Sequence, residues 1–262
     1  SEVFLSTCER CLWCRTGNPQ MCPEAKILGR GADGAFAEYF KTKAKLLHKI
    51  PDNVSDDEAA LTEMAAVVCQ CLVEKKIISP GSTVVVLGPG PIGQLSSQIA
   101  KALGAERVIV TGISKDKDRL KKARELGADV TVNVDEENPI EVVKNLTNGM
   151  GADVVIEASG VIQKTVEQAL DMVRRGGIIA QIGHDKRKPI SVIWDKIQEK
   201  SLTIYGTMAH AYNAWEEALS LMSSKKIKTA PLLTHKLTLE EWRKGFEMVE
   251  RGEGIKVSLI PK

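Results

Sequence analysis

The sequence predicts an α/β protein built around a parallel β-sheet that helices cover on both faces. From Thr83 onward, short apolar segments rich in β-branched residues alternate with amphipathic helical segments. Such alternation is typical of right-handed strand–helix–strand crossovers. Two further observations define the class more closely: a glycine-rich turn follows the first of these strands, and four cysteines gather near the start of the chain.

The expected elements follow one another along the chain. Residues 1–50 are expected to form loops and short strands, including 34–40, and Ser55 with Glu58 forms a capping-box pattern that opens a helix over 56–61. Two more amphipathic helices follow residue 213, before the apolar segment 257–260. Strands are expected at 83–87, 107–111, 130–134, 153–157, 177–183 and 202–205, and helices at 92–103, 120–126, 139–146 and 161–173.

Composition argues against several classes of partner. The chain has 262 residues, of which 43% are hydrophobic and 27% charged, as in ordinary globular enzymes. A formal net charge of +2 and an aromatic content of 4% give no basis for nucleic-acid or anionic-membrane binding. No apolar stretch approaches the length of a membrane span. These properties favour a cytoplasmic enzyme.

A cluster of cysteines is the most specific motif. Cys8, Cys11, Cys14 and Cys22 follow a C-x2-C-x2-C-x7-C pattern, which can close a tetrahedral shell of four thiolates around a structural Zn²⁺. Two disulfides are an alternative that six cysteines permit, but nothing else indicates a secreted protein. An iron–sulfur site is a second alternative, because Pro23 follows Cys22, yet the seven-residue gap departs from ferredoxin spacing. Zinc is favoured.

The glycine-rich turn predicts a dinucleotide site of the Rossmann type. Gly88, Gly90 and Gly93 fit G-x-G-x-x-G, directly after a strand and at the start of a helix, where Pro91 and Ile92 also lie. The three glycines serve a tight turn, close approach to a pyrophosphate, and helix–strand packing. The helix N-terminus offers N–H donors to the phosphates.

The end of the second strand favours NADP. Gly112, nineteen residues after Gly93, stands where an NAD site places an acid that binds the ribose 2′-hydroxyl. Hydroxyl and basic groups that would suit a 2′-phosphate follow it, namely Ser114, Lys115, Lys117 and Arg119. Two alternatives stay open: the charges may only form a solvated helix face, and Asp116 or Asp118 could supply the acid for NAD.

These motifs together resemble the zinc-dependent medium-chain dehydrogenases. The order of the cysteine cluster, Gly34-Ala-Phe-Ala-Glu-Tyr, Leu61-Thr-Glu-Met-Ala and the glycine motif is that of the family, closest to its sorbitol, polyol and threonine branch. The resemblance covers essentially the whole chain. It implies a partial GroES-like, β-rich catalytic domain with a structural zinc lobe over 1–63, a Rossmann domain over 64–206, and a C-terminal segment over 207–262 that returns to the catalytic domain.

The resemblance also implies roles for individual residues. Glu63 stands where relatives place a Cys, Asp or Glu at the catalytic zinc, either as a ligand of the zinc or bound to its water. By this resemblance Gly183 and His184 would lie along the nicotinamide, together with Thr207 and Met208. Lys256 takes the place of an Arg near the pyrophosphate.

Relatives carry further catalytic-zinc ligands upstream of the cysteine cluster, and this chain starts seven residues before Cys8. We therefore expect a fragment that binds NADP(H) but shows almost no turnover alone. The remaining candidates do not reproduce the ligand set, namely Cys69, Cys71, His48, His184, His210 and His235. Cys69 and Cys71 lie in an apolar helical stretch and are expected to pack.

The implied reaction is reversible oxidation of a secondary alcohol, polyol or sugar-derived, to a ketone, with hydride transfer to NADP. A zinc with an open position would lower the pKa of the alcohol. Partners would be the small-molecule alcohol or ketone and further copies of the chain in a homo-oligomer, a dimer or tetramer by analogy. The alternatives are an NAD-dependent polyol or threonine dehydrogenase, a zinc-free quinone-reductase-like enzyme, and a truncated non-catalytic nucleotide-binding module.

Overall fold

The computed structural model describes residues 1–184 and 189–261. The chain divides into two compact units. One unit joins Ser1–Cys69 to Met208–Lys262, and the other is continuous over Gln70–Thr207. The domain boundaries expected from the sequence, at 1–63, 64–206 and 207–262, remain a prediction. No helix in the described part of the chain is both long and apolar enough to cross a membrane.

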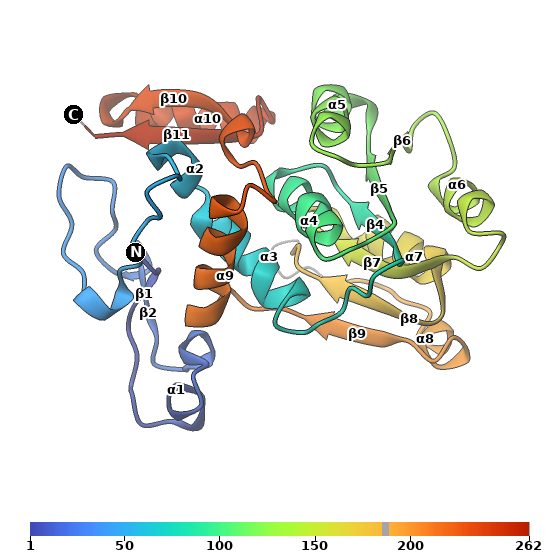
Figure 1. The fold of residues 1–262 in the computed structure, drawn as a ribbon, viewed down its shortest axis with the longest axis horizontal. Coiled ribbons are helices and arrows are strands. Elements are labelled where there is room, and N and C mark those ends of the chain that lie inside the picture. The colour runs from blue at the N-terminus through green and yellow to red at the C-terminus, as the bar shows by residue number, and fades with distance from the viewer. Residues whose placement is uncertain (185–188, 262) are drawn as a thin grey trace. The chain divides into compact units, whose positions relative to one another are not determined.

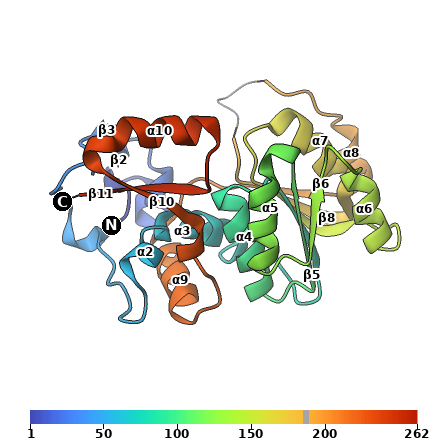
Figure 2. The same ribbon diagram turned by 90° about the horizontal axis from the view of Figure 1, so that it is seen from above.

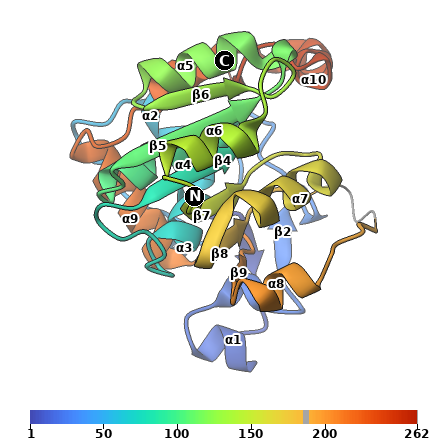
Figure 3. The same cartoon turned by 90° about the vertical axis from the view of Figure 1, so that its right-hand side faces the viewer.

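The continuous unit is built on a six-stranded parallel sheet, which confirms the predicted α/β class. Its strand order is β6-β5-β4-β7-β8-β9, so the order reverses between β4 and β7 (Figure 3). All five neighbouring pairs are parallel. The strands are β4 (Thr83–Leu87), β5 (Arg107–Gly112), β6 (Val130–Asn133), β7 (Ala152–Glu157), β8 (Val173–Gln181) and β9 (Thr203–Gly206).

Helices cover both faces of this sheet, with α4 and α5 on one side of the strands and α6 and α7 on the other (Figure 2). The helices and the short 3-10 turn of this unit are α4 (Pro91–Ala102), η3 (Ser114–Asp116), α5 (Lys117–Glu125), α6 (Pro139–Leu146), α7 (Ile162–Met172) and α8 (Asp195–Glu199). This arrangement is the doubly wound sheet that the sequence predicts.

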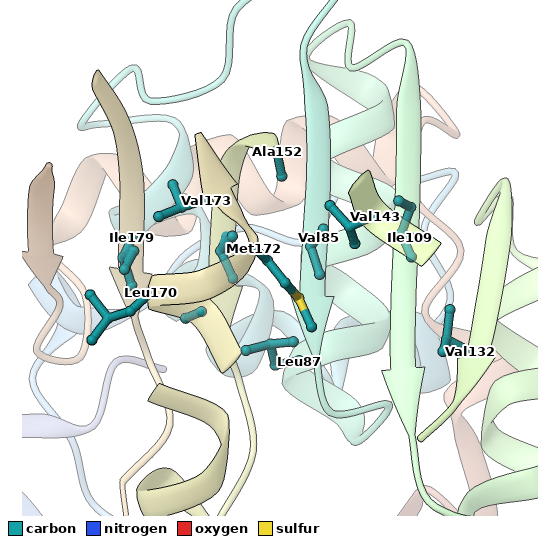
Figure 4. Packing of buried hydrophobic residues seen from close by; sticks show 12 residues of the cluster. Val85, Leu87, Ile109, Val132, Val143, Ala152, Leu170, Met172, Val173 and Ile179 are labelled. Carbon is teal, nitrogen blue, oxygen red and sulfur yellow. The ribbon is translucent and has the colours of Figure 1, made fainter. Parts of the chain in front are cut away.

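An apolar core cluster lies between the sheet and the helices α6 and α7. Val85 and Leu87 of β4 point into it, and Val143 of α6 and Leu170 of α7 meet them from the helix side (Figure 4). Because side chains alternate along a strand, the equally buried Val84 and Val86 face the helices of the opposite side. Burial on both faces explains why β4 reads as an unbroken apolar segment.

The discontinuous unit contains two small sheets. Strands β1 (Phe4–Ser6), β2 (Lys26–Leu28) and β3 (Gly31–Ala32) form one of them. Strands β10 (Leu233–Thr238) and β11 (Lys256–Ile260) pair in parallel, with the crossover helix α10 (Trp242–Arg251) lying along them (Figure 1). The other elements are α1 (Leu12–Arg15), η1 (Pro19–Met21), η2 (Ala44–Leu46), α2 (Asp56–Ala59), α9 (Tyr212–Ser223), η4 (Ala230–Leu232) and η5 (Leu239–Glu241). Helix α3 (Thr62–Leu72) starts in this unit, and its residues from Gln70 onward belong to the continuous unit.

Several boundaries differ from the sequence prediction. The helix expected over 56–61 ends at Ala59, and a second helix, α3, starts at Thr62. Residues 34–40 have no regular secondary structure, and Phe36 and Tyr39 are largely exposed. The strand expected from Gly177 starts at Val173, because Val173 pairs with Ala152 before an irregularity in the register. The capping box of Ser55 and Glu58 is confirmed.

Candidate cysteine cluster and dinucleotide site

The four cysteines of the N-terminal motif form one compact cluster. Their sulfur atoms all lie within 4.8 Å of one another. Cys11 Sγ is 3.5 Å and Cys8 Sγ is 3.9 Å from Cys14 Sγ. Zn–S bonds of about 2.3 Å in a tetrahedron place sulfurs about 3.8 Å apart, so the cluster has the dimensions of a closed four-thiolate site. It is the one group of three or more metal-ligating side chains among the described residues.

Backbone donors prepare the cluster for thiolates. The backbone N–H groups of Arg10 and Cys11 lower the pKa of Cys8 to about 7, and Cys11 N lies 3.3 Å from Cys8 Sγ. Cys8 N donates in the same way to Cys22 Sγ at 3.4 Å. Amide donors favour the charged form of a sulfur ligand. The surrounding loop therefore favours a thiolate at Cys8, whereas, despite a backbone hydrogen bond from Cys14, burial and the neighbouring thiols raise the pKa of Cys11 to about 11.

The glycine motif forms the turn between β4 and α4. Gly88 has a left-handed backbone with φ +100°, and a Cβ there would lie 3.1 Å from Ser159 Cα. A Cβ on Gly93 would lie 1.9 Å from Gly88 O, so no larger residue fits. A Cβ on Gly90 would meet no atom within 4 Å, so the backbone of Gly90 is open to a ligand. Gly90 caps α4 and Pro91 occupies its first turn, which leaves backbone N–H groups there for an anion.

Gly112 closes β5 beside this turn. A Cβ at position 112 would lie 2.8 Å from Pro89 Cγ and 3.2 Å from Leu120 Cδ2. The proline ring cannot swing away as a flexible side chain would. The strand end therefore has no room for a side chain while Pro89 occupies its present position.

The polar groups after Gly112 differ in their surroundings. Ser114 N donates to Asp135 Oδ2 at 2.8 Å, and Arg119 pairs with Asp116 at 3.2 Å. Lys115 and Lys117 are exposed. The ion pair occupies Asp116, one of the two acids, with Asp118, that are alternative ribose partners.

The other predicted cofactor residues lie at the ends of several elements. Gly183 follows β8, and its N–H donates to Glu157 O at 2.9 Å. His184 is exposed, directly before the residues that the structure does not describe. Thr207 N donates to Gln181 O at 3.1 Å, which holds the end of β9 to the end of β8. Met208 starts the second part of the discontinuous unit and is 56% exposed.

Glu63, Lys256 and His210 come together within the discontinuous unit. Glu63 lies in the first turn of α3, and its Oε1 is 3.8 Å from His210 Nε2. Burial raises the pKa of Glu63, and the charge of Lys256 opposes that rise. His210 is fully buried, and neither ring nitrogen has a hydrogen-bond partner among the described residues.

The histidine and cysteine candidates outside the motifs have distinct environments. His48 is buried between Glu216 at 2.5 Å and Glu2 at 3.1 Å. Cys69 and Cys71 are fully buried on α3, as expected for packing residues. His235 contacts its neighbour Thr234 at 3.0 Å.

Sequence reasoning missed two features of these sites. Nothing in the sequence pattern pairs His210 with Glu63, because their contact joins chain segments far apart in sequence. The buried Glu157 at the end of β7 was not singled out. A carboxylate that closes an otherwise apolar strand, as in Val-Val-Ile-Glu, is a signal that could have found it.

Comparisons with known proteins identify the class. Residues 91–224 match the zinc-binding dehydrogenase family, and residues 1–52 match the alcohol dehydrogenase GroES-like domain. The sorbitol dehydrogenase of Halalkalibacterium halodurans is 40% identical over 100% of this chain and 75% of its own length. The L-threonine 3-dehydrogenase of Bacillus subtilis is 35% identical over 97% of this chain and 72% of its own.

Solved structures agree with these relatives. The alcohol dehydrogenase TADH from Thermus sp. ATN1 superposes with a TM-score of 0.89 at 29% identity, over 99% of this chain and 76% of that one. A zinc-binding dehydrogenase structure from Sinorhizobium meliloti 1021, solved with NADP, superposes with a TM-score of 0.86 at 27% identity, over 98% and 74%. The chain belongs to the zinc-dependent medium-chain dehydrogenases. It is an alcohol-type oxidoreductase of that family, as the sequence predicts.

Proposed function

We propose that the protein oxidises a secondary alcohol of a polyol or sugar-derived substrate to a ketone and transfers the hydride to NADP. The main support is the structure around two glycines. The backbone of Gly90 is open to a ligand, and the strand end at Gly112 leaves no room for an acidic side chain. An NAD site needs that acid for the ribose diol, whereas a 2′-phosphate needs hydroxyl and basic donors.

Each part of the coenzyme has proposed partners in this chain. The turn from Gly88 to Gly93 and the start of α4 would bind the pyrophosphate through backbone N–H groups. Ser114, Lys115, Lys117 and Arg119 would bind the 2′-phosphate, with Arg119 exchanging part of its pairing to Asp116. Gly183, His184, Thr207 and Met208 would lie along the nicotinamide, and Lys256 near the pyrophosphate.

We assign the structural zinc to Cys8, Cys11, Cys14 and Cys22, because their sulfur spacing suits a closed tetrahedral shell. Such an ion contributes folding energy to its loop and no reactive position. Glu63 is the proposed residue of a catalytic zinc, as a ligand or as a partner of its water. Among the described residues only His210 accompanies it, and catalytic zinc takes three protein ligands. These two residues do not complete such a site, and we expect coenzyme binding without robust turnover by these 262 residues.

The relatives support the substrate class. Sorbitol, D-arabitol phosphate and L-threonine, named in the relatives, all present a secondary hydroxyl group. The higher identity to a sorbitol dehydrogenase favours a polyol, and an NAD-dependent polyol or threonine dehydrogenase is the second candidate.

Calorimetric titration with NADPH and NADH tests this proposal. We expect NADPH to bind at least tenfold more tightly. The double variant K115A/K117A should weaken NADPH binding about tenfold, a loss of about 1.4 kcal/mol, and leave NADH within twofold. K121A, an exposed lysine on the same helix, is the matched control. Tighter binding of NADH would reject NADP and would favour the NAD-dependent polyol or threonine dehydrogenase.

A further inference from the structure

Glu157, the last residue of β7, is a fully buried carboxylate. Oε1 accepts hydrogen bonds from Ser159 N at 2.9 Å and Ser159 Oγ at 2.5 Å, and Thr165 Oγ1 lies 2.9 Å away. Oε2 accepts one from Gln181 Nε2 at 2.8 Å. Within the described chain no basic side chain pairs with it. A buried charge is costly unless hydrogen bonds satisfy it, and here neutral donors do so.

The same residue holds the end of β8 through its backbone. Glu157 O accepts from Ile182 N at 3.0 Å and Gly183 N at 2.9 Å. Gln181 Nε2, besides its bond to Oε2, donates to Gly183 O at 2.5 Å. A Cβ on Gly183 would lie 2.5 Å from Glu157 Oε2 and 2.2 Å from Ser159 O. The segments that follow β7 and β8 are therefore packed on each other around one carboxylate.

This cluster also touches the glycine turn after β4. Ala158 N donates to Leu87 O at 3.0 Å, and a Cβ on Gly88 would lie 3.1 Å from Ser159 Cα. Strands β4 and β7 are the neighbours between which the strand order reverses. Ligands of doubly wound sheets bind outside the carboxyl ends of the strands at that point.

We propose that Glu157 is a positioning residue for the nicotinamide half of the coenzyme. It does not touch the coenzyme; it acts through Ser159 and Gly183, whose backbone it holds in one arrangement. The inference rests on the proposed function, because that function places the nicotinamide beside Gly183. The inference adds Glu157 to the proposed site and separates two roles. The glycine turn binds the phosphates, and the Glu157 cluster orders the surface next to the nicotinamide ring.

The chemistry of the cluster requires a carboxylate. Ser159 N and Gln181 Nε2 are amide donors that approach different oxygens of Glu157. In E157Q the new amide oxygen can serve only one of these sites, and the new NH₂ group meets a donor at the other. If Gln181 turned its own oxygen toward that NH₂, it would lose its bond to Gly183 O. The near-isosteric change thus loosens Gly183 without opening a cavity.

The test compares wild type, E157Q and the control E167Q, which makes the same change at an exposed position of α7. Calorimetry measures the affinities for NADPH and for 2′-phospho-ADP-ribose, which lacks the nicotinamide. We expect E157Q to weaken NADPH binding at least tenfold, to leave the fragment within twofold, and E167Q to change neither. Equal weakening of both ligands, or of neither, would overturn the positioning role.

A second measurement is independent of the coenzyme. Hydrogen exchange of the Ile182 and Gly183 amides, in protein without ligand, should be at least tenfold faster in E157Q than in wild type. Unchanged exchange would overturn the proposal even if NADPH affinity fell. If wild type bound neither ligand, the proposed function would fail, while the exchange rates would still decide whether Glu157 holds this segment.

Discussion

His210 Nε2 lies 3.8 Å from Glu63 Oε1, and both groups occupy surroundings that disfavour charge. The rings of Phe4 and Trp215 contact the imidazole edge-on at centroid distances of 6.2 Å and 5.0 Å. Burial lowers the pKa of His210 to about 4, and burial raises the pKa of Glu63. The histidine is therefore neutral at pH 7, with lone-pair and N–H positions that no described residue uses.

His210 should make the protein sensitive to acid. The folded-state pKa of its ring, about 4, lies below the unfolded value of 6.5, so the unfolded chain takes up the proton first. The proton uptake of His210 therefore costs no stability above about pH 6.5, and it lowers the free energy of unfolding as the pH drops toward 4. Urea unfolding at pH 7.5 and 4.5 should show wild type losing about 2 to 3 kcal/mol more than H210F between these pH values. H235F, which alters a histidine beside Thr234, should behave like wild type, and parallel losses in all three proteins would contradict the assignment.

Removal of the metal should disorder the N-terminal lobe. The cysteine loop holds only the four-residue α1 and the three-residue η1, and Trp13 and Met21 are more than 40% exposed. With so little apolar burial, metal ligation has to supply the stability of this loop. We expect one tightly held zinc per chain, and a chelator or C14S should remove it and change the fluorescence of Trp13.

C71A is the matched control, because Cys71 is buried on α3 and belongs to no cluster of metal ligands among the described residues. It should keep its zinc. A C14S protein that retained full zinc content and the wild-type fluorescence spectrum would contradict the assignment of the ion to this cluster.

The sequence predicted what local periodicity and spacing determine. The strand β4 and the capping box of Ser55 lie where the pattern placed them, and the four cysteines do converge. These features depend on residues close together in the chain, or on burial that any residue of the right type satisfies.

Contacts between distant segments could not be predicted in the same way. Glu157 meets Gln181 from the next strand along the sheet, and His210 meets Glu63 across nearly 150 positions. No periodicity encodes such pairs, because they depend on how crossovers and turns bring side chains into register. The start of β8 at Val173 differs from the expected Gly177 for a related reason, since its pairing with Ala152 precedes a shift in the register between β7 and β8.

The capping box should also lose stability in acid, through the carboxylate of Glu58. The backbone N–H of Ser55, at 2.9 Å, and Lys225 lower the pKa of Glu58. The ionised Glu58 therefore contributes fully to the free energy of unfolding above its unfolded pKa of about 4.3. This contribution is lost as the pH falls through the pKa of Glu58 in the folded state. E58Q should destabilise the protein by less than about 1 kcal/mol at pH 7, since the group is partly solvated, and by nothing at pH 3. Thermal unfolding measures both, with D33N as the exposed control; a cost that persists at pH 3 would exclude an ionic contribution.

Coenzyme choice should depend on Pro89 as much as on Gly112. A Cβ at position 112 would lie 2.8 Å from Pro89 Cγ, so G112D alone introduces a clash in the turn that binds the pyrophosphate. We expect G112D to weaken NADPH and NADH together. In P89A/G112D the shortened side chain at 89 makes room for the aspartate, which can then accept hydrogen bonds from the ribose diol and repel a 2′-phosphate.

Relative to wild type, the double variant should raise the ratio of NADH to NADPH affinity at least a hundredfold, or about 2.7 kcal/mol. P89A alone should leave the ratio within threefold, because it adds no charge. Calorimetric titration of the four proteins gives the full cycle. If G112D alone switched the preference to NADH with no loss of affinity, the contact between Pro89 and position 112 would not govern coenzyme choice, and the absence of an acid there would have some other cause than lack of space.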